Sequence, residues 1–397
     1  MILYRLYPTI LNRYILRTFF HPFLIGFIFF TFIHLLFYLK EAIKAAVEKG
    51  IPTNLIFDLL LNSMGWTLSI TVPMSTLFAV IIAIGGMNSD SELTAIRAGG
   101  IAYSRIFRPF VFLGIFMTIV MLWFNLQLNP YCFGNMRSAM SAIFRYDPIA
   151  ILEPGQFTTL DKTANLERHI YIESITKDKK TEQETLRNIQ IRTTKKGKDK
   201  IFRLSQLIIA GKGQKIIKEA SGKEVKALRL YEGYIFLQDS DSKNFQRINF
   251  HKGSMDINIL EPEDYKEHND IKNIQAMNLS ELLHEITKLK KIALKNKRKD
   301  ENGVRKAYLE LHKRIALSFA AFSFMYLGFP LSITHRRSGK GMGLGISIIF
   351  IFLYYILFLG ADSIIVKFNN LPVFIAAWAA NFVNILIGLY FFKKKIY

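Results

Sequence analysis

Six apolar runs, each long enough to cross a lipid bilayer, constrain the fold of this chain more than any other feature of its sequence. A membrane-spanning helix needs about 20 predominantly apolar residues. The runs cover residues 18–39, 55–87, 107–128, 315–333, 342–365 and 372–392. Hydrophobic residues make up 51% of the chain, which is typical of a membrane protein that carries a more polar domain. The sequence therefore predicts an α-helical membrane protein with six transmembrane helices.

The positions of the charged residues predict how these helices are oriented. The formal net charge is +21, and lysine and arginine gather at both termini, after the second run and after the fourth run. Cytoplasmic loops of membrane proteins carry such an excess. We therefore expect both termini in the cytoplasm and the long segment after the third run on the opposite, outer side of the membrane. A nucleic-acid partner is not expected, because the basic residues lie at the ends of apolar runs.

The segment between the third and fourth runs has the pattern of a β domain. Apolar and polar residues alternate in short stretches such as 169–173, 188–192 and 228–237, and turn-forming residues separate these stretches. This period of two is typical of antiparallel strands in a sandwich or jelly roll. From residue 279 the apolar spacing becomes that of a helix, with Ser280 as its candidate N-cap.

The chain is therefore expected to consist of three parts. Residues 1–128 hold the first three transmembrane helices, residues 129–310 form an inserted periplasmic all-β, jellyroll-like domain that ends in a helical segment at about 279–310, and residues 311–397 hold the last three helices. Between the second and third helices, a polar stretch at about 88–106 is composed of helix-forming residues. By the same topology, this stretch lies at the cytoplasmic face.

No glycine-rich or histidine-containing segment of the sequence fits a catalytic or nucleotide-binding motif. Residues 211–215 lack the spacing of a phosphate loop, and His284 lacks the second histidine of a zinc-binding helix. We therefore expect no catalytic residue, no metal site and no cofactor bound by this chain. Two classes of function remain open at this point: a stand-alone lipid transporter or flippase, and a membrane-anchored periplasmic binding scaffold.

The polar stretch after the second run resembles a segment of a known family. SDSELTAIRAGGI at residues 89–101 is similar to the stretch that follows the second span in the LptF/LptG (YjgP/YjgQ) permeases of the lipopolysaccharide export ABC transporter. Further similar segments follow in the same order as in that family: NRYILRTFFHPFLIG at 12–26, EKGIP at 48–52, EPGQF at 153–157, LHKRIAL at 311–317, GFPLSI at 328–333 and AAWAAN at 376–381.

The resemblance implies six transmembrane helices with a periplasmic β-jellyroll inserted between the third and fourth, and it also implies a function and a set of partners. Members of this family extract lipopolysaccharide, or a related glycolipid, from the bacterial inner membrane and pass it to a periplasmic bridge. ATP and Mg would be used by an LptB-like cytoplasmic ATPase. The other implied partners are a second LptF/LptG-type permease and LptC/LptA-like periplasmic jellyroll proteins. Two points remain open. The chain is either the F-like or the G-like permease, and it pairs either with an identical copy or with a different permease.

The resemblance also implies that the polar stretch is a cytoplasmic coupling helix at about 88–106 that docks on the ATPase, and it assigns roles to residues of this helix. Glu92 matches the family's coupling glutamate, which would pair with a basic residue of the ATPase. Arg97, Ala98 and Gly99 would complete the docking surface. The alternative is a solvated loop in which Glu92 pairs only with nearby arginines.

Two groups of residues are candidates for contact with the transported lipid. Lys40 and Lys44 lie one helical turn apart at the outer end of the first run, where their ammonium groups would meet headgroup phosphates. Snorkelling of both side chains to the membrane interface is the alternative. In the β domain, inward-facing apolar side chains would line an acyl-chain groove, and the candidates are Ile170, Ile172, Ile189, Ile191, Tyr234 and Phe236.

Overall fold

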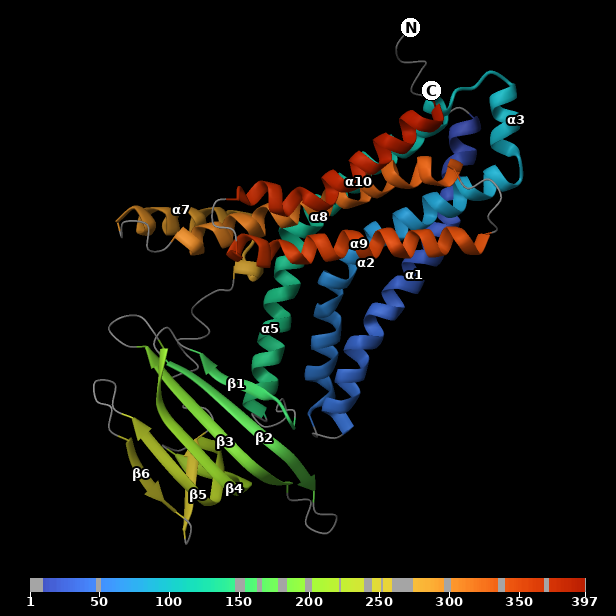
Figure 1. Cartoon of the computed structure of the whole chain (residues 1–397). Coiled ribbons are helices and arrows are strands. Elements are labelled where there is room, and N and C mark those ends of the chain that lie inside the picture. The colour runs from blue at the N-terminus through green and yellow to red at the C-terminus, as the bar shows by residue number, and fades with distance from the viewer. Residues whose placement is uncertain are drawn as a thin grey trace. The chain divides into compact units, whose positions relative to one another are not determined.

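The computed structural model describes residues 10–47, 51–146, 154–162, 166–177, 184–196, 202–220, 223–238, 245–250, 253–258, 274–295, 301–334, 340–367 and 371–396. These residues form two compact units, a helical unit and a β unit (Figure 1). The helical unit draws on Met1–Lys44, Ile56–Ser138 and Asn273–Tyr397, and the β unit on Ala45–Leu55 and Ala139–Lys272. Each unit has a hydrophobic core of its own.

In the part of the chain that the structure describes, six helices are long and apolar enough to cross a membrane. They are α1 (Ile10–Val47), α2 (Thr53–Ser89), the continuous helix made of α4 (Tyr103–Trp123), η2 (Phe124–Leu128) and α5 (Asn129–Tyr146), α8 (Glu301–Thr334), α9 (Lys340–Lys367) and α10 (Val373–Ile396). The expected helical membrane protein with an inserted β domain is confirmed. Several helices exceed the apolar runs because lysine and glutamate are good helix formers, as where α1 continues past Lys40.

Helix α8 is the central helix of the helical unit. Its most apolar stretch is 78% buried, whereas that of α1 is only 17% buried. Met325 and Phe329 of α8 belong to a core shared with α1, α2 and α4. Phe324 and Leu327 belong to a second core shared with α2, α9 and α10. The other spans are therefore held together largely through α8.

A buried asparagine reinforces this arrangement. Asn381 of α10 accepts a hydrogen bond of 2.9 Å from Ser323 of α8 and donates one of 2.8 Å to the carbonyl of Ala316. The hydroxyl of Tyr354 in α9 donates to the same asparagine at 3.3 Å. A buried amide is stable only with such partners. The three last spans are consequently linked by polar as well as apolar contacts.

The described residues of the β unit form a seven-stranded antiparallel sheet. Its strands are β1 (Phe157–Lys162), β2 (Leu166–Lys177), β3 (Glu184–Lys196), β4 (Phe202–Ala220), β5 (Lys223–Gln238), β6 (Phe245–Asn249) and β7 (Ser254–Asn258). They pair in the order β1-β2-β3-β4-β5-β6, while β7 pairs with the first half of β5. Among the described strands the pairing is thus that of a meander, without the crossing connections of a jelly roll.

In four adjacent strands of this sheet, the alternation of core-facing and outward-facing side chains shifts by one residue at the same level. We call the four residues at this level the crease row. The crease row consists of Glu173, Asn188, Gly211 and Glu232. Asn188 and Glu232 have left-handed backbones, with φ of 49° and 57°. Leu186 and Ile189 are both fully buried although they lie three positions apart, which strict alternation would forbid. The left-handed residues therefore turn both halves of the sheet toward one core.

After the β unit the chain continues through η3 (Ile274–Ala276) and α7 (Leu279–Lys295). The prediction that Ser280 is the N-cap is wrong, because α7 begins at Leu279 and Asn278 is its N-cap. Asn278 accepts a hydrogen bond of 2.9 Å from the amide of Glu281, and the Glu281 carboxylate accepts one of 2.9 Å from the amide of Asn278. This reciprocal pair is a capping box.

A buried arginine holds η3 against α8. Arg314 is 5% exposed, and its guanidinium donates to the carbonyls of Ile274 at 2.9 Å, Gln275 at 3.0 Å and Met277 at 2.7 Å. The guanidinium also pairs with Glu310, one turn away on α8, at 2.9 Å. A buried arginine stays charged and needs partners of this kind. The segment that follows the β unit is therefore fixed at one place on α8.

Candidate functional site

A helix of seven residues, α3 (Glu92–Ala98), connects α2 to α4 and contains the candidate coupling residues (Figure 1). It follows Ser91, whose φ is 59°, and it ends before Gly100, whose φ is 80°. The amide of Gly100 donates to the carbonyl of Arg97 at 2.9 Å, as in a Schellman C-terminus. The helix expected at about 88–106 is therefore divided among α2, α3 and α4, because a right-handed helix cannot continue through left-handed residues.

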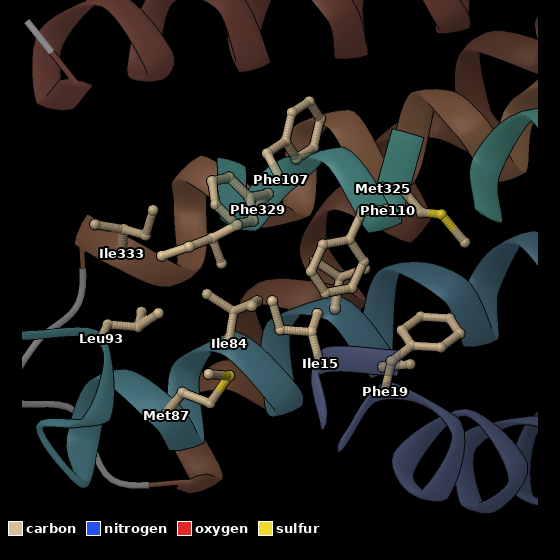
Figure 2. Close-up of a cluster of buried hydrophobic side chains, with 13 residues drawn as sticks. Ile15, Phe19, Ile84, Met87, Leu93, Phe107, Phe110, Met325, Phe329 and Ile333 are labelled. Atoms are coloured by element: carbon tan, nitrogen blue, oxygen red, sulfur yellow. The ribbon is translucent and has the colours of Figure 1, made fainter. Parts of the chain in front are cut away.

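One face of α3 packs into the core of the helical unit. Leu93 is fully buried, and Ile96 packs against the same cluster. Figure 2 shows Leu93 at one end of this cluster, near Ile84, Met87 and Ile333. Four spans contribute side chains to the cluster: Ile15 and Phe19 from α1, Ile84 and Met87 from α2, Phe107 and Phe110 from α4, and Met325, Phe329 and Ile333 from α8. Burial of a leucine side chain contributes roughly 1.5–3 kcal/mol. Leu93, supported by Ile96, thus fixes α3 to a core built by four spans.

The opposite face of α3 is exposed. It consists of Thr94, Ala95, Arg97 and Ala98, followed by Gly99. The guanidinium carbon of Arg97 lies 4.4 Å from the ring centroid of Tyr103, a cation–π contact that restrains the arginine. The structure therefore brings together three of the sequence candidates, Arg97, Ala98 and Gly99, on one exposed strip.

Glu92 is the first residue of α3 and is partly exposed. Its Oε2 accepts a hydrogen bond of 2.7 Å from the hydroxyl of Tyr14, a residue of α1. A carboxylate at this position is also favoured by the helix dipole. Sequence reasoning missed Tyr14, which lies 78 residues from Glu92. The only signal was topological, since both residues were expected at the cytoplasmic ends of their helices.

The end of α2 that precedes α3 is anchored as well. Asn88 is buried, and its side-chain amide donates long hydrogen bonds to the carbonyls of Ser332, at 3.4 Å, and Ile333, at 3.3 Å. These carbonyls belong to the last turn of α8 and have no partner within the helix. Asn88 therefore ties the C-terminal ends of α2 and α8 together beside α3.

The candidate headgroup lysines lie at the other end of α1. The side chain of Lys40 is exposed. The backbone of Lys44 belongs to α1, one turn further on, but its side chain lies outside the described part of the chain. Neither lysine belongs to the site around α3.

The candidate groove residues of the β unit fall on two faces of the sheet. Ile170, Ile172, Ile189 and Ile191 share one face and are at most 2% exposed. Tyr234 and Phe236 lie on the other face, because Ile235 between them is the residue that faces the core. Arg247 covers both rings, with its guanidinium carbon 4.0 Å from the Tyr234 centroid and 5.9 Å from that of Phe236. The prediction that Tyr234 and Phe236 line the same groove as the four isoleucines is therefore wrong.

Comparison with known proteins agrees with this architecture. The sequence profile of the family described as "Lipopolysaccharide export system permease LptF/LptG" matches residues 13–394. Curated relatives include the lipopolysaccharide export system permease protein LptF of Escherichia coli (strain K12), of Escherichia coli O157:H7 and of Shigella flexneri. Each is 22% identical over 315 residues, which cover 77% of this chain and 74% of the relative. The match includes all six spans, the β unit and α3, and the chain belongs to the LptF/LptG family of lipopolysaccharide export permeases.

Proposed function

We propose that this permease extracts lipopolysaccharide, or a related glycolipid, from the inner membrane and passes it to a periplasmic bridge, driven by ATP hydrolysis in a separate LptB-like subunit. The observation that carries the proposal is the two-faced packing of α3, with Leu93 fully buried among four spans and the opposite strip exposed. Packed helices move as units when a neighbouring part is displaced. A protein docked on α3 would therefore move the spans.

In this proposal the exposed strip of α3 is the docking surface for the ATPase. Glu92 would pair with a basic residue of that subunit. Ala98 and Gly99 would allow the two backbones to approach closely, and Arg97 would supply a cation at the edge of the contact. ATP and Mg would be bound by the partner, and this chain would contribute no cofactor site.

Family membership and the exposed surface of the spans support the remaining proposed partners. Helices α1, α4, α9 and α10 expose many large apolar side chains, which a second LptF/LptG-type permease or lipid would cover. Both termini would lie in the cytoplasm, and the β unit would lie in the periplasm next to LptC/LptA-like proteins. The basic residues at both ends of the chain support this orientation.

Two contacts with the lipid belong to the same proposal. Lys40 and Lys44, at the far end of α1 from α3, would bind headgroup phosphates. The four isoleucines of the sheet, Ile170, Ile172, Ile189 and Ile191, would contact acyl chains once the sheet opens, because in this structure they are buried. A side chain on the opposite face, such as Tyr234, would not.

The test is Glu92→Ala in the complete transporter, reconstituted in nanodiscs with lipopolysaccharide. Truncating one partner of an interfacial charge pair costs about 2–5 kcal/mol, so we expect ATP-dependent lipid release to fall by roughly tenfold or more. Asp90→Ala, which removes a neighbouring exposed carboxylate, is the control and should leave release unchanged. Parental release by the Glu92→Ala variant would contradict the coupling role. Failure of the parent chain to co-purify with an ATPase would favour a stand-alone transporter.

A further inference from the structure

The hydrogen bond between Tyr14 and Glu92 connects the least buried span to the first residue of the coupling helix. We propose that Tyr14 is a positioning residue that orients the Glu92 carboxylate for the ATPase and transmits displacement of α3 to α1. This inference rests on the proposed coupling role of Glu92. It adds a residue from a distant part of the chain and a polar route from α3 to a span.

The geometry favours orientation of the carboxylate. A glutamate side chain at a partly exposed helix end has several accessible rotamers, and ordering it costs conformational entropy. The 2.7 Å bond from the Tyr14 hydroxyl holds Oε2 in one place before any partner arrives. A carboxylate has two oxygens and accepts several hydrogen bonds, so one bond from a hydroxyl leaves capacity for a cation. Tyr14 thus lowers the ordering cost of docking.

The same bond supplies a second connection between α3 and α1. The apolar connection is made one residue further along α1, where Ile15 is fully buried in the cluster that contains Leu93. The polar connection is Tyr14 to Glu92. Elsewhere α1 is sparsely buried, with 17% of its most apolar stretch covered. Within this chain α1 therefore has few contacts besides these two, and they specify where α3 acts on it.

Three substitutions separate the possible roles of this bond. Tyr14→Phe removes the donor and keeps the ring, and because the side chain is 43% exposed the fold should be retained. Glu92→Gln keeps an oxygen acceptor for Tyr14 but removes the charge. Glu92→Ala removes both. Tyr390→Phe, which deletes the hydroxyl of an exposed tyrosine on α10, is the matched control.

The first measurement is lipid released per ATP hydrolysed, with the complete transporter in lipopolysaccharide-containing nanodiscs. Hydrogen bonds to charged groups are stronger than average, but exposure weakens them, so we expect Tyr14→Phe to lower the ratio about threefold to tenfold. In the Glu92→Ala background, Tyr14→Phe should have no further effect. Tyr390→Phe should match the parent.

The outcomes distinguish this inference from the proposed function. If Tyr14→Phe matches the parent, or lowers the ratio equally in the presence and absence of Glu92, the positioning role is overturned while the coupling role of Glu92 stands. If Glu92→Ala itself matches the parent, the coupling role fails, and this inference fails with it.

The second measurement detects the contact without transport. The ¹⁹F resonance of 3-fluorotyrosine at position 14 should shift in the Glu92→Ala variant and stay nearer its parental position in Glu92→Gln, which retains an acceptor. Addition of the ATPase subunit should shift it only while residue 92 can accept the bond. If the ¹⁹F resonance keeps the same position whatever residue occupies position 92, then Tyr14 does not contact Glu92 and the inference is wrong.

Discussion

The side-chain amide of Asn125 in η2 donates a hydrogen bond of 3.0 Å to the hydroxyl of Ser318 in α8. The carbonyl oxygen of the same amide accepts a bond of 2.6 Å from Ser69 in α2. All three side chains are fully buried. The π-helical turn of η2 widens the third span at this point, and such turns often occur at functional positions. One polar side chain therefore joins three spans inside the helical unit.

Replacing Asn125 by alanine should lower the thermal stability of the protein in nanodiscs. The change removes two buried hydrogen bonds, which in membrane interiors contribute about 0.6–2 kcal/mol each. Asn129→Ala is the control, because its amide reaches Asn125 only at 3.5 Å and should matter less. Thermal unfolding followed by tryptophan fluorescence measures both. Equal midpoints for the Asn125→Ala variant and the parent would contradict the structural role.

Leu93→Ala should uncouple ATP hydrolysis from lipid release. Loss of a fully buried leucine costs about 2–5 kcal/mol in a packed core, and here it would loosen α3 from the cluster of four spans. We expect hydrolysis to continue while lipid released per ATP falls. Leu61→Ala, at a position 56% exposed on α2, should leave that ratio unchanged. A parental ratio in the Leu93→Ala variant would show that α3 acts through other contacts.

Arg314→Met should loosen the segment that follows the β unit. The substitution removes three hydrogen bonds to the carbonyls of residues 274, 275 and 277 and leaves those oxygens to find new partners. Breaking a buried charged contact costs about 3–5 kcal/mol. Hydrogen exchange should accelerate at residues 274–282, and Lys306→Met, at an exposed position of the same helix, should leave it unchanged. Parental exchange in the Arg314→Met variant would contradict the anchoring role.

Photo-crosslinking should tell the two faces of the β sheet apart. A photoreactive residue at position 172, on the core face, should crosslink to lipopolysaccharide when the complete transporter turns over ATP, because acyl chains need an apolar surface. The same probe at position 234, on the opposite face beside Arg247, should not. Crosslinking at position 234 alone would place the lipid on the outer face and contradict the groove.

The sequence predicts the spans well because each is specified locally. Twenty apolar residues in a row have few alternatives to a membrane helix, and the six runs coincide with α1, α2, α4, α8, α9 and α10. The family resemblance rests on short ordered segments and is confirmed by the match over residues 13–394. The length of an apolar run and the order of the similar segments can both be read directly from the sequence.

Contacts between distant residues are not specified in this way. Tyr14 and Glu92 are each ordinary by sequence, and their hydrogen bond depends on how α1 and α3 pack. The prediction that Tyr234 faces the core is wrong for a related reason, because the alternation of side chains in β5 is interrupted at Glu232. Glutamate seldom adopts a left-handed backbone, so the sequence gives no sign of this interruption, as a glycine would. The division of the polar stretch at Ser91 is a further example.

The crease row makes the sheet sensitive to the length of its strands. The apolar pattern of each long strand is out of phase on the two sides of this row, so the residue at the row acts as a spacer between two half-strands. Deleting Glu232 would shift the first half of β5 by one residue, so that its inward and outward side chains exchange faces. Arg229 would then point into the core, and Leu228 and Leu230 would be exposed. Single-residue insertions and deletions should therefore be rare at this level in related permeases, while substitutions that accept a left-handed backbone should be common.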